Sequence, residues 1–121
     1  MEKSYFDNDP QLVSNEGSDI LICFDVEHTT EERIPMGGGK PELVEVIKAY
    51  AVRVPHPIDR GKIIDAIVTA MYPADKMQAV VNNYLLDPTD DEREAEMEAM
   101  QDWRAKAKQV ATEVMEVVEN E

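Results

Sequence analysis

The stretch DILICFDVEH, residues 19–28, has the alternating pattern of a β-strand. Side chains two residues apart share one face of a strand. The even positions form an apolar face: Ile20, Ile22, Phe24 and Val26. Asp25 and Glu27 share the other face near the end of the stretch. We therefore predict a strand over about 19–28, buried more fully at its beginning than at its end.

A second strand is predicted over about 43–54, LVEVIKAYAVRV. Valines and a tyrosine occupy one of its faces, and Lys48 interrupts that face, which indicates a bulge or a sheet edge. The two strands are expected to pair antiparallel. Helices from the second half of the chain are expected to cover this sheet.

The loop between these strands, IPMGGGKP at 34–41, has the glycines of a phosphate-binding loop. Such a loop needs a helix directly after it, because the helix N-terminus supplies N–H donors. Here Lys40 is followed by Pro41 and then by a valine-rich strand. We expect the three glycines to allow positive φ in a connection between strands.

After Val54 the apolar residues recur at helical spacing. Asp59 is placed to cap a helix over about 60–71, and Pro73 precedes a second over about 74–86. Thr89 and Glu92 match the Thr-x-x-Glu capping box of a third helix over about 90–118.

The third helix carries an apolar stripe at alternating spacings of three and four: Met100, Trp103, Ala107, Val110, Val114 and Val117. Two arrangements remain open. The stripe packs on the sheet and the preceding helices, or its last part projects and pairs with a partner helix.

The first eighteen residues are polar and aperiodic, and they are expected to form a flexible N-terminal lead-in. Residues 19–119 are expected to form a single α+β domain. In it a small antiparallel β-sheet from the N-terminal half packs against about three α-helices from the C-terminal half. A chain of 121 residues is long enough to bury such a core.

The chain is strongly acidic, with 26 acidic and 12 basic side chains and a net charge of −14. Phosphate backbones and anionic membranes would repel it, so direct nucleic-acid binding and membrane binding are not expected. The acids either solvate the surface or mimic nucleic acid toward a basic protein. Cys23 is the only cysteine, so an intrachain disulfide is excluded, and we expect a cytoplasmic protein.

Candidates for chemistry are few. Asp25, Glu27 and His28 are residue types that ligate divalent metals, but strand alternation separates His28 from the two carboxylates. His56 lies between two prolines without a partner at a recognisable spacing. We predict no catalytic, cofactor-binding or metal-binding residue, no cofactor, and a protein that is not an enzyme.

Two segments of the chain resemble known proteins: IDAIVTAMYPADKMQAVVNNYLLDP and EMEAMQDWRAKAKQVA. Over residues 58–115 the chain resembles small uncharacterised proteins of gut anaerobic bacteria found in prophage-like or mobile-element contexts. The motif is Tyr84-Leu85, then Trp103-Arg104 with Lys106 and Lys108. The resemblance implies a phage or mobile-element accessory role that acts by protein contact.

These features favour a non-enzymatic protein-interaction or assembly factor, whose partner is another protein or a second copy of the chain. The candidate partner-binding residues lie on the third helix: Trp103, Arg104, Lys106 and Lys108. Trp103 also suits a core position. The alternatives are an acidic nucleic-acid mimic that inhibits a DNA- or RNA-binding protein, and a metal-dependent enzyme that uses Asp25, Glu27 and His28.

Overall fold

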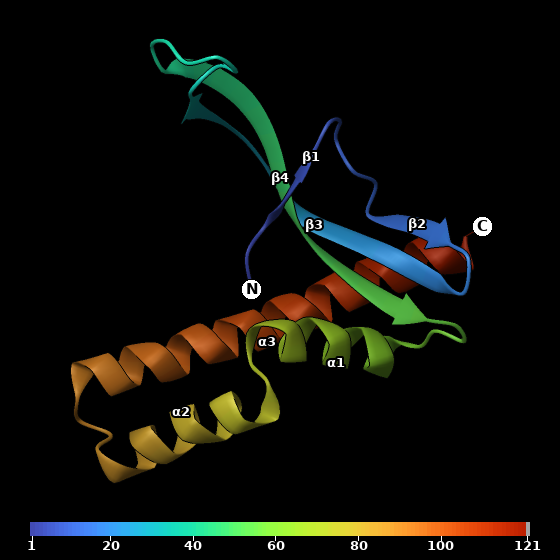
Figure 1. Ribbon diagram of the computed structural model, residues 1–121. Coiled ribbons are helices and arrows are strands. Elements are labelled where there is room, and N and C mark those ends of the chain that lie inside the picture. Colours follow the sequence, from blue (N-terminus) through green and yellow to red (C-terminus); the bar gives the residue numbers. More distant parts are fainter. Residues whose placement is uncertain (121) are drawn as a thin grey trace.

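The chain folds as an antiparallel β-sheet followed by a layer of helices (Figure 1). The structure is a computed structural model, and it describes residues 1–120. Over these residues there are four strands in the N-terminal half and three helices in the C-terminal half. The α+β class predicted from the alternating and helical patterns is confirmed.

Two long strands form the centre of the sheet. β3 (Asp19–Arg33) and β4 (Glu42–Pro55) pair antiparallel along their lengths, and the sheet order is β1-β4-β3-β2. The predicted strands at 19–28 and 43–54 lie within them. β3 continues five residues beyond its predicted end, because Thr29 and Thr30 suit a strand and pair with β4 there.

The N-terminal segment is part of the sheet, which corrects the expectation of a flexible lead-in. β1 (Ser4–Phe6) pairs with β4, and β2 (Val13–Glu16) pairs with the beginning of β3. These strands are too short for a sequence period to show. Their pairing comes from the two edges that the long hairpin offers, a tertiary effect that local composition does not carry.

A bulge on β3 ends the core-facing run. Phe24 pairs with Tyr50, and Glu27 pairs with Lys48. The two residues Asp25 and Val26 therefore lie opposite the single residue Ala49 of β4. Asp25 has a positive φ of 52°. The extra residue reverses the alternation, so Glu27 follows on the face of Phe24 and Val26 is 42% exposed. The strand pattern predicted Val26 on the core face, and the bulge overturns this.

The helices are α1 (Arg60–Met71), α2 (Ala74–Leu86) and α3 (Asp91–Glu119). Their bounds match the predicted ranges to within one residue. Asp59 caps α1 as predicted, since its carboxylate accepts a hydrogen bond from the Lys62 amide at 2.8 Å.

The predicted capping box of the third helix is wrong by one residue. The Asp90 carboxylate accepts hydrogen bonds from the amides of Glu92 and Arg93, at 2.9 and 3.2 Å. The Thr89 hydroxyl instead donates to Asp87 at 3.2 Å. A carboxylate suits this position better than a hydroxyl, because it also carries a full negative charge at the positive end of the helix dipole.

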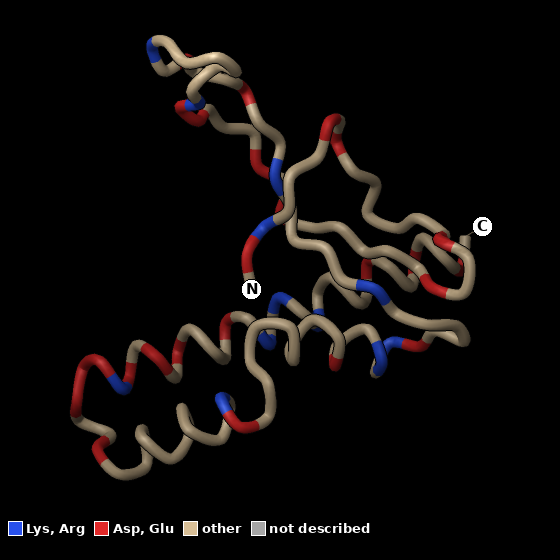
Figure 2. The backbone as a smooth tube through the Cα atoms, in the orientation of Figure 1, with Lys and Arg blue, Asp and Glu red and all other residues tan. Residues whose placement is uncertain are grey.

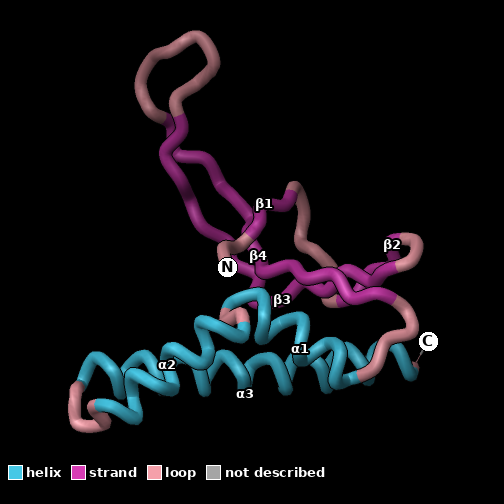
Figure 3. The backbone as a smooth tube through the Cα atoms, turned by 60° about the horizontal axis from the view of Figure 1, so that its bottom comes forward, coloured by secondary structure: helices cyan, strands magenta, loops and turns pink. Residues whose placement is uncertain are grey.

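The core lies between one face of the sheet and the pair formed by α1 and the second half of α3 (Figure 3). The fully or nearly fully buried side chains include Ile20, Ile22, Phe24, Val54, Ile63, Ile67, Ala107, Val110 and Val114. The last part of α3 is therefore docked, and the alternative in which it projects is wrong. Val110 and Val114 are buried in the core with the sheet residues. Val117 is the one residue of the stripe that is markedly exposed.

α2 packs along the first half of α3 and lies beyond the sheet, so these two segments form a helical hairpin to one side (Figures 1 and 3). The sheet is thus covered by two helices instead of three. No helix of residues 1–120 combines the length and the apolar composition that crossing a membrane would require.

Candidate interaction surface

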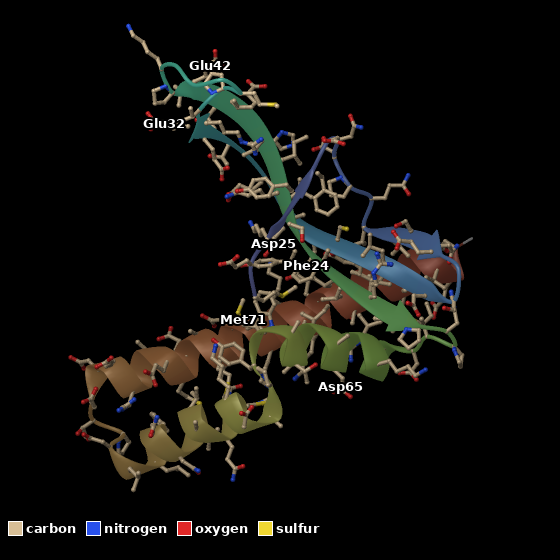
Figure 4. The ribbon with its side chains drawn as sticks, in the orientation of Figure 1. Phe24, Asp25, Glu32, Glu42, Asp65 and Met71 are labelled. Atoms are coloured by element: carbon tan, nitrogen blue, oxygen red, sulfur yellow. The ribbon has the colours of Figure 1, made fainter. Side chains whose placement is uncertain are left out.

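The long hairpin projects away from the helices as a two-stranded ribbon (Figure 1). We call residues 27–48 the β-arm: the end of β3, the connecting loop 34–41 and the beginning of β4. Figure 4 shows Phe24 at the point where the core ends and Glu32 and Glu42 near the far end of the β-arm. The bulge at Asp25 is the start of the projection, because after Val26 β3 carries only polar side chains up to Arg33.

A cross-strand cluster holds the base of the β-arm to β1. It consists of Tyr5 on β1, Glu31 on β3 and Lys48 on β4. The Tyr5 hydroxyl lies 2.9 Å from both Glu31 carboxylate oxygens and donates to them, and the Lys48 ammonium donates to one of these oxygens at 3.1 Å. The three side chains thereby tie three strands together where no helix supports the sheet.

The contacts shift the protonation of all three groups. The hydrogen bond from Tyr5, followed by that from Lys48, lowers the pKa of Glu31 from 4.5. The bonds to Glu31 raise the pKa of Lys48 from 10.5 and the pKa of Tyr5 from 10.0. The Glu31 contribution to stability is therefore present above pH 4.5 and is lost as the pH falls through the lowered pKa. The Lys48 and Tyr5 contributions are present at neutral pH and are lost as the pH rises through their raised pKa values.

The tip of the β-arm exposes apolar side chains. Ile34 is 70% exposed, Leu43 is 73% exposed, and Met36 is fully exposed. The loop between them turns at Pro35, whose carbonyl accepts a hydrogen bond from the Gly38 amide at 3.0 Å. Gly37, Gly38 and Gly39 all have positive φ, which confirms the predicted role of the glycines in a strand connection.

Trp103, a predicted partner-binding residue, is half-buried and packs against the core. Its indole N–H donates to the Ile67 carbonyl at 2.9 Å. Its ring lies 5.8 Å from that of Phe24 and meets the Tyr50 ring edge-on at 5.1 Å. These contacts join α3 to α1 and to both long strands, so Trp103 serves the packing of the helices on the sheet.

The three basic residues near Trp103 lie in different surroundings. Lys106 pairs with the Asp25 carboxylate at the bulge, at 3.0 Å. Arg104 is half-buried and donates to Gln101 at 3.5 Å, and Lys108 is exposed. Lys106 therefore fixes α3 to the start of the β-arm, and Arg104 and Lys108 are the members of the predicted set that solvent reaches without such a tie.

The three residues of the alternative metal-dependent enzyme pair with three different partners. Asp25 pairs with Lys106, Glu27 lies 3.8 Å from the Lys3 ammonium, and His28 lies 2.6 Å from the Asp9 carboxylate. Within the described residues no group of three or more His, Cys, Asp or Glu side chains is arranged to hold a metal ion. The geometry does not bring the three candidates together.

The sequence reasoning missed the β-arm as a functional surface. A usable signal was present: apolar Ile34, Met36 and Leu43 flank a glycine turn, where a solvated hairpin end would carry polar residues. The alternating pattern alone does not show that no helix covers this end.

Comparisons with known proteins add no relative. No protein-family model matches the chain, and no curated protein and no solved structure matches it.

Proposed function

We propose that the protein is a non-enzymatic interaction or assembly factor of the cytoplasm, and that the β-arm is its working surface. The single observation that carries this proposal is the exposed apolar tip on a ribbon that no helix covers. A phage or mobile-element accessory role, which the resemblance over residues 58–115 implies, is part of the proposal.

The energetics of the ribbon support this function. A two-stranded hairpin is marginally stable in water unless a third strand or a helix covers it. Beyond β1, no third strand and no helix of residues 1–120 covers the β-arm. The apolar side chains at its tip therefore stay exposed to water. Burying such side chains in a partner contributes about 1.5–3 kcal/mol for each large aliphatic group.

The test compares two double variants in affinity capture from a lysate of the native host. Ile34→Ser with Met36→Ser, the tip variant, removes two of the three exposed apolar side chains at the tip of the β-arm. Leu85→Ser with Leu86→Ser is the matched control, because these leucines are 69% and 84% exposed at the end of α2. Partners captured by the wild type should be kept by the control and lost by the tip variant, with circular dichroism showing that both variants are folded. Equal capture by the folded tip variant would contradict the proposed surface.

The acidic-mimic function remains a second candidate, because the acids are gathered in space. Residues 87–102, which form the turn after α2 and the beginning of α3, contain a single basic residue, Arg93, against eight acidic ones: Asp87, Asp90, Asp91, Glu92, Glu94, Glu96, Glu98 and Asp102. Figure 2 shows acidic positions at this turn and along the adjoining half of α3. A complex formed there should be competed away by DNA and should weaken steeply with salt. Persistence in high salt would exclude this function.

A further inference from the structure

The β-arm has open backbone groups along both outer edges, because in the described part of the chain β2 pairs with β3 only over residues 19–22 and β1 ends beside Ile47 of β4. Along the β-arm β4 pairs with β3 on one side, whereas on its other side β1 pairs only with Ile47, Lys48 and Ala49. β1 ends at Phe6, so the outer edge of Glu42–Val46 has no strand partner among residues 1–120. We call this segment the β4 edge. Alternate residues of an antiparallel strand direct their N–H and C=O groups outward, so the β4 edge offers donors and acceptors to an added strand.

A hollow lies beside the β4 edge. It has a volume of about 690 Å³, and its lining comes from the end of β1, from β3 and from β4, including Phe6, Asp7, Arg33, Val44, Glu45 and Val46. Val44, Val46 and Phe6 give it an apolar part. An extended segment bound there would continue the path of β1 beyond Phe6 and would run antiparallel to β4.

The β4 edge contains no proline, no lysine and no bulge. Edges are commonly blocked by proline, by lysine or by a bulge. Pro41 and Lys40 precede the β4 edge, and the bulge lies on β3 at Asp25, before the β-arm begins. Only Glu42 and Glu45 carry charge within the segment, and these charges also select what can pair with it.

The charges beside the β4 edge favour a basic occupant. Asp7 and Glu45 line the hollow, and Glu42 ends the segment. The nearby cations are engaged, since Lys48 binds Glu31 and the Arg33 guanidinium lies 5.6 Å from the centre of the Tyr5 ring. A second copy would bring another net charge of −14, whereas lysines opposite Glu42 and Glu45 would pair with them.

We propose that the β4 edge binds an extended, basic segment of a partner protein as an added antiparallel strand in line with β1. This rests on the proposed interaction function and names the chemistry of the partner. Backbone hydrogen bonds supply affinity in such strand addition, and the side-chain pattern supplies specificity. The expected pattern puts Val opposite Val46, Val44 and Leu43, and Lys opposite Glu45 and Glu42.

The test uses synthetic peptides and amide NMR of the full chain. The probe is acetyl-Thr-Val-Lys-Val-Val-Lys-Thr-amide. One control peptide replaces both lysines with glutamate, and another replaces the central valines with proline. The lysine probe should shift the amides of residues 42–46. At nine-tenths saturation it should slow exchange of their outward-facing amides about tenfold, because only the free fraction exchanges. Neither control peptide should do so, and added salt should weaken the binding.

Charge reversal completes the test. Glu42→Lys with Glu45→Lys should transfer the preference to the glutamate peptide, and Glu32→Lys on the opposite strand should leave it unchanged. Equal shifts from all peptides, or shifts outside the β4 edge, would overturn the proposal. Concentration-dependent protection of the same amides without peptide would also overturn it, because a second copy would then be the occupant. If the tip variant loses its host partners while the probe does not bind, the interaction function stands and this inference fails.

Discussion

Trp103 is expected to contribute to folding, and the structure allows the size of its contribution to be worked out. Trp103→Ala removes the aromatic contacts to Phe24 and Tyr50 and the hydrogen bond to Ile67. Large-to-small substitution of a packed tryptophan costs about 3–5 kcal/mol in the free energy of unfolding.

Trp103→Phe separates the hydrogen bond from the ring contacts. It keeps an aromatic ring but loses the N–H donor, which contributes about 0.5–1.5 kcal/mol. Ile67 lies inside α1, so its carbonyl keeps an intrahelical donor and is not left unpaired. We expect a total loss of about 1–2 kcal/mol once the smaller ring area is included.

Urea unfolding followed by far-ultraviolet circular dichroism measures both losses. Fluorescence is unsuitable for the variants, because Trp103 is the only tryptophan. Lys108→Ala is the control and should change the free energy of unfolding by less than about 0.5 kcal/mol, since Lys108 is exposed. A loss below about 1 kcal/mol for Trp103→Ala would refute the packing role and return Trp103 to the candidate partner-binding residues.

Three further predictions follow from the bulge, the cross-strand cluster and the helix cap. Tyr5→Phe should raise the pKa of Glu31 toward 4.5, because the hydrogen bond that lowers it most is lost; an unchanged NMR titration of the Glu31 carboxylate would contradict this. Asp25→Gly should stay within about 1 kcal/mol of the wild type in urea unfolding, because glycine accepts the positive φ, whereas Asp25→Val should lose about 1–3 kcal/mol; equal stability of the two variants would show that the bulge is not strained. Asp90→Ala should destabilise by about 1 kcal/mol and Thr89→Ala by less than about 0.5 kcal/mol in thermal unfolding, and the reverse order would restore the threonine cap.

The helices were predictable because their signals are local. Asp59 before an apolar period, Pro73 at a break and the acids around Asp90 mark the three starts within a few residues of each helix. The apolar stripe of α3 likewise gave its buried face, since Met100, Ala107, Val110 and Val114 are all buried. The cap of α3 was predicted at Thr89, one residue before the observed cap Asp90, because both neighbouring side chains are capable of capping.

The candidate interaction surface could be found only from the tertiary structure. β1 and β2 exist because β3 and β4 give them edges to pair with, and no pattern within residues 1–18 announces that pairing. Alternation placed Asp25 and Glu27 together, but one extra residue at the bulge reversed the faces and sent Asp25 to Lys106.

The sequence by itself determined the two long strands, the three helices and their bounds to within one residue, the α+β class and the net charge, because each depends on neighbouring residues or on composition. The tertiary structure decided that the hairpin of β3 and β4 extends beyond the helices and that α2 packs on α3 instead of on the sheet. The exposed tip and the open β4 edge follow from that arrangement. Whether a strand is covered depends on where distant elements pack, and this is a property of the whole fold.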